Sequence, residues 1–293
     1  MQVERLSTPG ARLFRGRTHD GHAVEFLDAT RDDEAAQRRV FVVSTLLGCP
    51  VQCRVCDAGG GYRGRVTADE LLAQVRALAA AAWGDGPPAV PEVRVELTRM
   101  GEPAFNPHVL DFLDALPAAL SPARATVLFS TVAPAGADDF FEALLAVKAR
   151  RYPVGALALQ VSLFSSDEAE RRRVVPVKVW PFSTIAAWGR RAVAPGERVT
   201  LNVPRTALAV DAAHLAAVFP PDVFRVKLSE LTPTAASRAS GLAPAEGDAA
   251  LEAALVAQGF EVQREVAASP EAGCGAYLSA DQVQARPRRT LRR

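Results

Sequence analysis

The stretch S-T-L-L-G-C-P-V-Q-C-R-V-C-D-A-G-G-G-Y, residues 44–62, decides how the rest of the chain is interpreted. It contains three of the four cysteines, Cys49, Cys53 and Cys56, in the spacing C-x3-C-x2-C. A helix would bring the first two onto one face, but the proline and the three consecutive glycines favour a loop. A loop can direct three thiolates toward one point, so this stretch predicts a shared metal site.

The number of thiolates indicates the kind of metal group. An iron–sulfur cluster usually has four cysteine ligands, so three would leave one iron of a four-iron cluster open to a substrate or cofactor. Structural zinc needs a fourth Cys or His nearby, and the nearest histidines, His22 and His108, are distant in sequence. A disulfide framework does not suit 293 residues with four cysteines and no secretory signal. We therefore predict a [4Fe-4S] cluster on Cys49, Cys53 and Cys56.

Length and composition predict one barrel-sized domain. The 293 residues are 49% hydrophobic, which is enough for a large core. No apolar run reaches membrane-spanning length, and the first 20 residues lack a signal-peptide core. We therefore expect a cytoplasmic protein without a membrane partner, which suits an oxygen-sensitive cluster.

Charge gives little information about a partner. The net charge of +1 provides no overall attraction to nucleic acid. A local exception is R-P-R-R-T-L-R-R, residues 286–293. A solvated end and a phosphate-binding segment both remain open for this basic tail.

Apolar periodicity predicts alternating strands and helices after the cysteines. Residues 67–70, T-A-D-E, form a capping box at the start of a helix that ends near Gly84. Further helices are predicted at 106–120, 138–150, 183–193, 211–219 and 248–258. Strands are predicted at 93–97, 125–130, 156–163, 199–203, 224–228 and 260–266.

This alternation corresponds to about six right-handed parallel βα units, too few for a closed eightfold barrel. Active groups are expected at the carboxyl ends of the strands. Ahead of these units, residues 22–27 and 40–43 predict a hairpin around a charged turn. The sequence therefore predicts an α/β fold with a short N-terminal β-hairpin extension, residues 1–43, and a barrel over residues 44–293.

The cysteine spacing, between a predicted strand and a predicted helix, resembles the radical S-adenosylmethionine (SAM) superfamily. The resemblance implies a partial (β/α)6 radical SAM barrel, with a [4Fe-4S] cluster and SAM as cofactors. In that superfamily the open iron binds the amino and carboxylate groups of SAM, and one-electron reduction cleaves SAM to methionine and a 5′-deoxyadenosyl radical. A flavodoxin- or ferredoxin-like electron donor is the implied partner.

Several polar residues follow predicted strands where the superfamily binds SAM. Gly101 and Glu102, in R-M-G-E-P, come one βα unit after the cysteines. Glycine lets the backbone approach a ligand, and a carboxylate can bind an ammonium, so this element resembles the one that binds the amino group of SAM. Ser130 and Ser162 end the next two strands, where a hydroxyl can bind a ribose or carboxylate, or simply cap the strand.

Five blocks, in order, are similar to one family, the adenosine C-methyltransferases of large-subunit rRNA and tRNA (the RlmN/Cfr group). They are G-C-x3-C-x2-C, M-G-E-P-x-x-N, S-T-V-A-P, S-L-F-S-S-D-E-A-E-R and A-G-C-G, and the similarity runs from about Gly21 to the C-terminus. The resemblance implies that Cys274, in a C-terminal loop, is methylated by one SAM. A radical from a second SAM then activates that methyl group for addition to an adenine ring carbon of RNA. Glu25 matches the base that removes the ring proton, and without that match it would be an ordinary exposed strand carboxylate.

The chain departs from this family at several positions. The family releases its protein–RNA crosslink with a second cysteine seven residues before the first cluster cysteine, and that position is Val42 here. The SAM-binding asparagine of the family corresponds to Thr232, and the histidine after Ser-Leu corresponds to Phe164. We find no counterpart of the family's N-terminal RNA-binding domain in these residues, and the net charge offers no substitute.

Three functions therefore remain open. The first is an RlmN/Cfr-like C-methyltransferase that uses Cys274 as methyl carrier, with RNA adenosine as the substrate named by the resemblance. The second is a divergent radical SAM enzyme that acts on a small molecule, nucleotide or peptide without a methylcysteine and disulfide cycle. The third is an inactive SAM- or RNA-binding remnant, which would release no 5′-deoxyadenosine.

Overall fold

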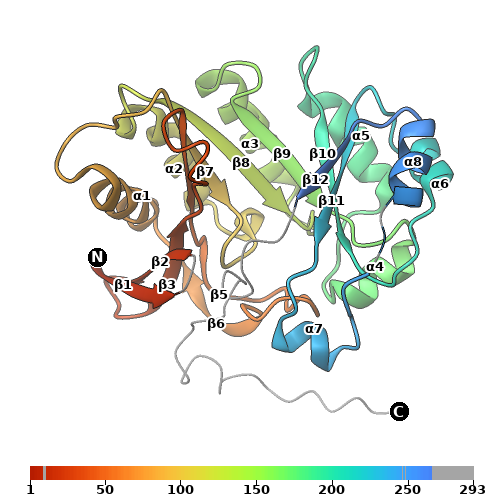
Figure 1. Cartoon of the computed structure of the whole chain (residues 1–293), viewed down its shortest axis with the longest axis horizontal. Coiled ribbons are helices and arrows are strands. Elements are labelled where there is room, and N and C mark those ends of the chain that lie inside the picture. The colour runs from red at the N-terminus through yellow and green to blue at the C-terminus, as the bar shows by residue number, and fades with distance from the viewer. Residues whose placement is uncertain (9–10, 246, 248, 266–293) are drawn as a thin grey trace.

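A computed structural model describes residues 1–8, 11–245, 247 and 249–265, and its main feature is a continuous ten-stranded sheet (Figure 1). Seven consecutive strands of this sheet are parallel, and they lie side by side in chain order. This order is expected when each βα unit adds the next strand to the same edge. The strands are β4 (Arg38–Val42), β7 (Glu92–Leu97), β8 (Arg124–Thr131), β9 (Leu157–Ser162), β10 (Val199–Arg205), β11 (Phe224–Glu230) and β12 (Val262–Glu265).

Helices connect the parallel strands and cover the outer face of the sheet (Figure 1). Helix α1 begins at the predicted capping box, where Thr67 Oγ1 accepts from Glu70 N at 3.3 Å and Glu70 Oε2 accepts from Thr67 N at 3.0 Å. The helices α4 and α7 were not predicted. The helices are α1 (Ala68–Trp83), α2 (His108–Ala119), α3 (Asp138–Arg151), α4 (Glu168–Val174), α5 (Phe182–Ala192), α6 (Ala212–Val218), α7 (Ala235–Ala239) and α8 (Ala249–Ala257), with the short 3-10 helix η1 (Pro103–Phe105).

The two faces of the parallel strands differ in polarity. On β9, Leu157, Leu159 and Val161 are buried in the main core, whereas Gln160 and Ser162 line an interior cavity. The core is completed by aromatic contacts, including Phe141 of α3 with Trp180, in the segment before α5, at a ring-centroid distance of 4.4 Å. The alternation therefore places apolar side chains toward the helices and polar side chains inside the barrel.

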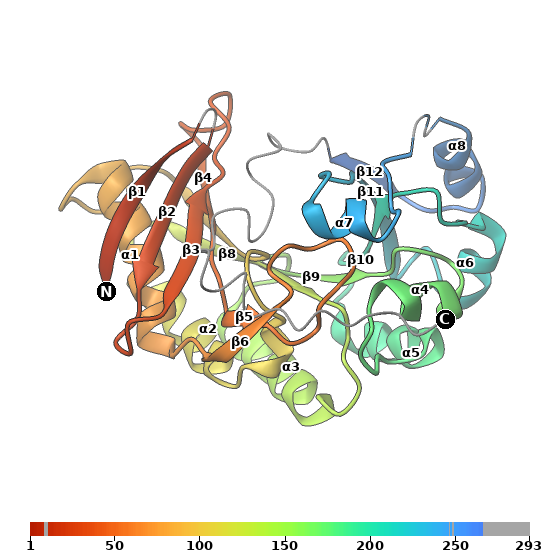
Figure 2. The ribbon, with the colours of Figure 1, turned by 90° about the horizontal axis from the view of Figure 1, so that it is seen from below.

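Three antiparallel strands extend the sheet at its N-terminal edge (Figure 2). They are β1 (Gln2–Thr8), β2 (Ala11–Arg17) and β3 (Ala23–Asp28). β3 and β4 are antiparallel neighbours, as the predicted hairpin requires, whereas β1 and β2 were not predicted. Because β4 also pairs in parallel with β7, the sheet continues without a break across residue 43. The division of the chain into an extension, residues 1–43, and a barrel, residues 44–293, therefore stays a prediction.

The sheet curls but leaves one side of the barrel open. A cavity of about 880 Å³ separates β3 and β4 from β11 and β12, and we call it the side cavity. Leu27 and Val42 contribute to one wall, and Ser229 and Glu265 to the other. The predicted partial (β/α)6 barrel is therefore the observed architecture, with β4, which was predicted only as part of the N-terminal hairpin, as a further parallel strand.

The stretch that contains the cysteines is a two-stranded ribbon around a turn, where the sequence predicted a loop throughout. Strands β5 (Leu46–Cys49) and β6 (Gly60–Arg65) are antiparallel, and they place Cys49 at the end of a strand. Gly48 has φ +76°, and a Cβ atom there would lie 2.6 Å from the Gly60 carbonyl oxygen. Only glycine allows the two strands to approach this closely.

Candidate active site

The three clustered cysteines line one cavity of about 290 Å³, which we call the cysteine cavity. Gly101, Glu102, Ser130 and Ser162 line the same cavity, so four segments separated in the sequence meet there. Gly101 and Glu102 follow β7, Ser130 lies near the end of β8, and Ser162 ends β9. These are the carboxyl ends of the strands, where active groups were expected. Across the described ranges, no three His, Cys, Asp or Glu side chains lie close enough to hold one ion.

The thiols of Cys49 and Cys53 lie in an environment that favours the neutral form. Burial is the main cause that raises the pKa of Cys49 to about 12. Burial, with a smaller contribution from Cys49 and Glu102, raises the pKa of Cys53 further above its ordinary value. A bound metal reverses this preference, because a coordinating thiol is deprotonated. Three soft sulfur donors around a dry cavity therefore fit an iron–sulfur cluster, in which each thiolate binds a different iron.

Glu102 is the buried carboxylate of the cysteine cavity. Its Oε1 accepts from Thr131 Oγ1 at 2.6 Å and from Ala104 N at 3.1 Å, and its Oε2 accepts from Val132 N at 2.8 Å. Burial raises the pKa of Glu102 to about 7, although these hydrogen bonds act in the opposite direction. The carboxylate is thus held rigidly and poorly solvated, which strengthens its attraction for an ammonium group.

Gly101 brings this carboxylate next to the cysteine ribbon. Its φ is +109°, and a Cβ atom would lie 2.6 Å from Leu46 Cβ. Thr45 N and Leu46 N both donate to the Met100 carbonyl, at 2.8 and 3.2 Å. The segment that ends β7 and the start of β5 are therefore in contact along their backbones.

Buried amide side chains fix the residues around the cysteine ribbon. Asn106, the last residue of M-G-E-P-x-x-N, donates through Nδ2 to Thr45 O at 2.8 Å and to Val66 O at 2.7 Å. Gln74 of α1 binds the backbone of Ser44, accepting from its N–H at 2.9 Å and donating to its carbonyl at 3.0 Å. The asparagine of that motif therefore has a structural role here.

Polar side chains of the strands form the wall opposite the cysteines. Gln160 Nε2 donates to Ser130 Oγ at 2.9 Å, and Ser162 and Asn202 continue the wall. Asn202 Oδ1 is buried and has no hydrogen-bond partner. A buried acceptor without a donor is costly, so the N–H or O–H group of a bound ligand would satisfy it. The sequence analysis missed Asn202 because an asparagine within an apolar strand is not part of any motif.

Among the described residues, two predicted site residues do not line the cysteine cavity. Thr232 lines the adjoining side cavity. Glu25 lies on β3 and lines neither cavity, and Cys274 lies outside the described residues, as does the basic tail. The side cavity nevertheless joins the cysteine cavity, because Cys56, Arg99 and Asn202 line both.

Glu25 is buried rather than exposed, so its interpretation as an ordinary exposed carboxylate was wrong. Its Oε2 lies 3.0 Å from Arg99 Nη2, and both side chains are 1% exposed. Its Oε1 has no hydrogen-bond partner. Ser44, which precedes the cysteines, donates through its hydroxyl to the Glu25 carbonyl. Arg99 lines both cavities, whereas Glu25 lines neither.

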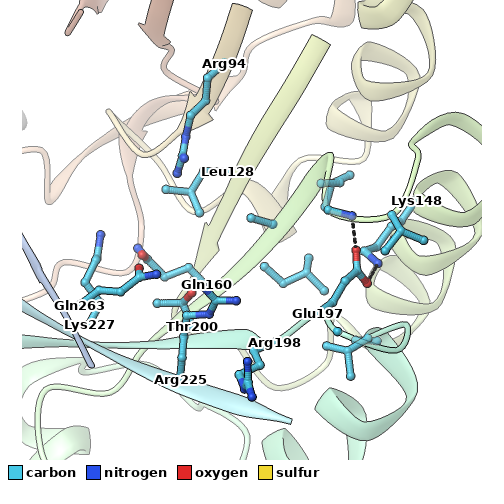
Figure 3. A pocket seen from close by; sticks show the side chains of 18 of the residues that line it. Arg94, Leu128, Lys148, Gln160, Glu197, Arg198, Thr200, Arg225, Lys227 and Gln263 are labelled. Atoms are coloured by element: carbon cyan, nitrogen blue, oxygen red, sulfur yellow. Dashed lines mark hydrogen bonds and ion pairs between the residues drawn. The ribbon is translucent and has the colours of Figure 1, made fainter. Parts of the chain in front are cut away.

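A third cavity, which we call the chamber, has a volume of about 530 Å³ and lies inside the barrel at the amino ends of the strands (Figure 3). It shares Leu128, Gln160, Lys227 and Glu265 with the cysteine cavity. Its cations are all in ion pairs, so the chamber is nearly balanced in charge. The pairs are Arg94–Glu96, Lys148–Glu197, Arg198–Glu261, Arg225–Glu261, Lys227–Glu265 and Arg264–Glu252.

Comparison with known proteins finds similar sequences over nearly two thirds of this chain. A probable dual-specificity RNA methyltransferase RlmN of Prochlorococcus marinus (strain MIT 9303) is 30% identical over 189 residues, which are 63% of this chain and 49% of that protein. The dual-specificity RNA methyltransferase RlmN of Marinobacter nauticus is 29% identical over 195 residues, 64% of this chain and 48% of that protein. The chain is a distant relative of RlmN. It spans about half the length of these relatives, and no protein-family model matches it.

The fold is also that of a solved relative. A radical SAM methyltransferase from Sphaerobacter thermophilus superimposes with a TM-score of 0.73 at 23% identity, over 94% of this chain and 80% of that one. The expected α/β partial-barrel fold, with its N-terminal antiparallel strands, is therefore confirmed. In the part of the chain that the structure describes, no helix has the length and apolar character needed to cross a bilayer.

Proposed function

We propose that this RlmN relative is a radical SAM methyltransferase. The observation that supports it is the convergence on one cavity of Cys49, Cys53, Cys56 and the pair Gly101–Glu102. The cysteines would hold a [4Fe-4S] cluster with one open iron, and the cluster with SAM would supply a 5′-deoxyadenosyl radical. To test this, the protein is reconstituted anaerobically and incubated with SAM. Dithionite replaces the ferredoxin- or flavodoxin-like electron donor, and we expect release of 5′-deoxyadenosine. An inactive remnant would release none.

The residues of the cavity have distinct roles in this proposal. Glu102 binds the ammonium of SAM, and Gly101 lets the backbone lie against the ligand. Ser130 and Ser162, supported by Gln160, present hydroxyls to the ribose or carboxylate. Buried apolar side chains, including Val51, Val132 and Phe164, line part of the cavity and would limit the access of water that could quench a radical.

We further propose that Cys274 carries a methyl group and that an adenosine of RNA receives it. The proposal rests on the relation to RlmN proteins, whose names specify RNA methyltransferases. After incubation with methyl-labelled SAM and tryptic digestion, we expect the label on the peptide that contains Cys274, and none in Cys274→Ala. An active enzyme with an unlabelled Cys274 would refute the carrier role.

Glu25 is proposed as the base that removes the ring proton. For this role it must part from Arg99, because the carboxylate is now paired and out of reach of both cavities. Glu25→Gln is therefore expected to leave 5′-deoxyadenosine release within about threefold of wild type but to lower RNA methylation by at least about 100-fold, the lower end of the usual range for a general base. Mass spectrometry of the RNA and chromatography of the nucleoside would measure the two products. Equal losses of 5′-deoxyadenosine release and RNA methylation would show that Glu25 has a structural role instead.

A second candidate function is a radical SAM enzyme for a small molecule, nucleotide or peptide. The observation that favours it is Val42, which is 7% exposed, packs with Leu13 and Leu27, and lines the side cavity where the family would have its releasing thiol. The chain has four cysteines, and none is left for this step once the cluster and Cys274 are assigned. Full turnover of a small substrate by Cys274→Ser would favour this function over the first.

A further inference from the structure

Arg171 is a fully buried cation on α4, and its side chain is among the largest that the fold encloses. It is 1% exposed. Its Nη1 donates to Trp180 O at 2.9 Å and its Nη2 donates to Val132 O at 2.7 Å, while its Nε has no hydrogen-bond partner. The guanidinium also lies 5.6 Å from the ring centroid of Phe182. The side chain is therefore held in place by neutral groups.

The charge of Arg171 is not balanced by an ion pair. Among the described residues, no carboxylate lies within ion-pair distance of it, whereas its helix neighbours Arg172 and Arg173 are paired with Glu168 and Glu170. Glu168 and Glu102 act on it only from further away, and burial lowers its pKa to about 10. Burying a charge without a partner costs several kcal/mol, so a missing negative charge is expected nearby.

The surroundings of Arg171 point to the cysteine cavity as the place of that charge. Val132, which accepts from Arg171, lines the cavity and donates its own N–H to Glu102. The helix is also tied to the cysteine loop, since Arg54 N donates to Val174 O at 2.9 Å. Val174 packs in the same apolar cluster as Cys49 and Cys53. Helix α4, which carries Arg171, is therefore packed against the cysteine segment.

We propose that Arg171 is the buried counter-charge of the iron–sulfur cluster and raises its reduction potential. This inference rests on the proposed function. Three thiolates give an oxidised [4Fe-4S] cluster one net negative charge, and uptake of one electron from the donor, without a proton, gives it two. A fixed cation in a poorly solvated site stabilises the more negative state, because net charge and exposure set the potential of such clusters.

The test compares Arg171→Met, which removes the charge, with Arg171→Lys, which retains it. Cluster-loaded protein without SAM is titrated with dithionite, and the reduced cluster is followed by electron paramagnetic resonance. For Arg171→Met we expect a reduced-to-oxidised ratio at least about tenfold lower at a given potential, which is a shift of about 59 mV for one electron. Arg171→Lys is expected to shift the ratio less than about threefold, because the charge remains. Arg172→Met is the matched control, since its side chain is 57% exposed and solvent screens it.

The outcomes separate charge from structure. An unchanged potential in Arg171→Met, or equal shifts in the Met and Lys variants, would overturn the proposal. If Arg171→Met does not retain the cluster, Arg171→Gln, which can still donate to a carbonyl, takes its place in the same comparison. Loss of iron in both neutral variants but not in Arg171→Lys supports a counter-charge, and loss in all three shows a packing role. A wild-type protein without iron and sulfide would instead contradict the proposed function.

Discussion

Replacing any one of Cys49, Cys53 and Cys56 by alanine is expected to abolish cluster binding and SAM cleavage. In the proposed site each thiolate would bind a different iron, so the remaining two could not hold the cluster with its fourth iron open. We expect the iron content to fall from about four per chain to near zero, and the rate of 5′-deoxyadenosine release to fall by at least about 1000-fold, or about 4 kcal/mol. Iron and sulfide analysis after anaerobic reconstitution, with chromatography of the nucleoside, would measure both.

Cys274→Ala is the matched control, because it removes the fourth thiol of the chain and leaves the three clustered ones. It should retain the full iron content and reductive SAM cleavage. Far-ultraviolet circular dichroism of each variant checks the fold, since Cys49 is a buried residue packed with Val51 and Val132. A Cys53→Ala protein that keeps both the iron and the cleavage would contradict the assigned ligand set.

The second large effect is expected for Glu102→Gln. This change removes the charge that we propose attracts the ammonium of SAM. It also replaces one carboxylate oxygen, which accepts from the donors Thr131 Oγ1, Val132 N and Ala104 N, by an amide NH2 group that cannot accept. A charge-assisted hydrogen bond contributes about 2 kcal/mol, so we expect SAM to bind about 30-fold more weakly. Equilibrium dialysis of labelled SAM against cluster-loaded protein would measure the loss.

The same carboxylate predicts a dependence on pH. Because burial raises the pKa of Glu102 to about 7, the group takes up a proton as the pH falls through that value and no longer attracts an ammonium. Wild-type affinity for SAM should therefore drop between pH 8 and pH 6, by up to about tenfold per pH unit, and Glu102→Gln should lack this dependence. Glu96→Gln is the control, because Glu96 lines the same cavity but pairs with Arg94. Equal losses in both variants would argue against the role of Glu102.

The main pattern of the fold could be predicted because it is local. The capping box at Thr67 and the apolar periods of the parallel strands depend on residues close in sequence, and each corresponds to an observed element. β1 was missed because its side chains are mostly exposed and show no apolar alternation, as with Val3 at 42%. α4 was missed because its sequence E-A-E-R-R-R-V resembles a solvated charged run, and only Arg171 and Val174 are buried.

The candidate site was predicted in part for the same reason. Cys49, Cys53 and Cys56, with Gly101 and Glu102, occur in short motifs, and the structure places them in one cavity. The buried pair of Glu25 and Arg99 joins residues far apart in the chain, so no local pattern indicated it. Asn202 and Arg171 were missed because their importance comes from an unpaired polar atom and an unpaired charge, which exist only after burial.

The sequence by itself determined the donor set, three thiols with a glycine–carboxylate pair, and the alternation of strands and helices that builds a partial barrel. Only the tertiary structure decided which polar groups share the cavity and which are shielded from water. Examples are the buried hydrogen bonds from Thr131 to Glu102 and from Arg171 to the Val132 carbonyl. The physical reason is that spacing along the chain specifies local conformation, whereas burial, and with it the strength of every charge, depends on segments that meet only when the sheet closes.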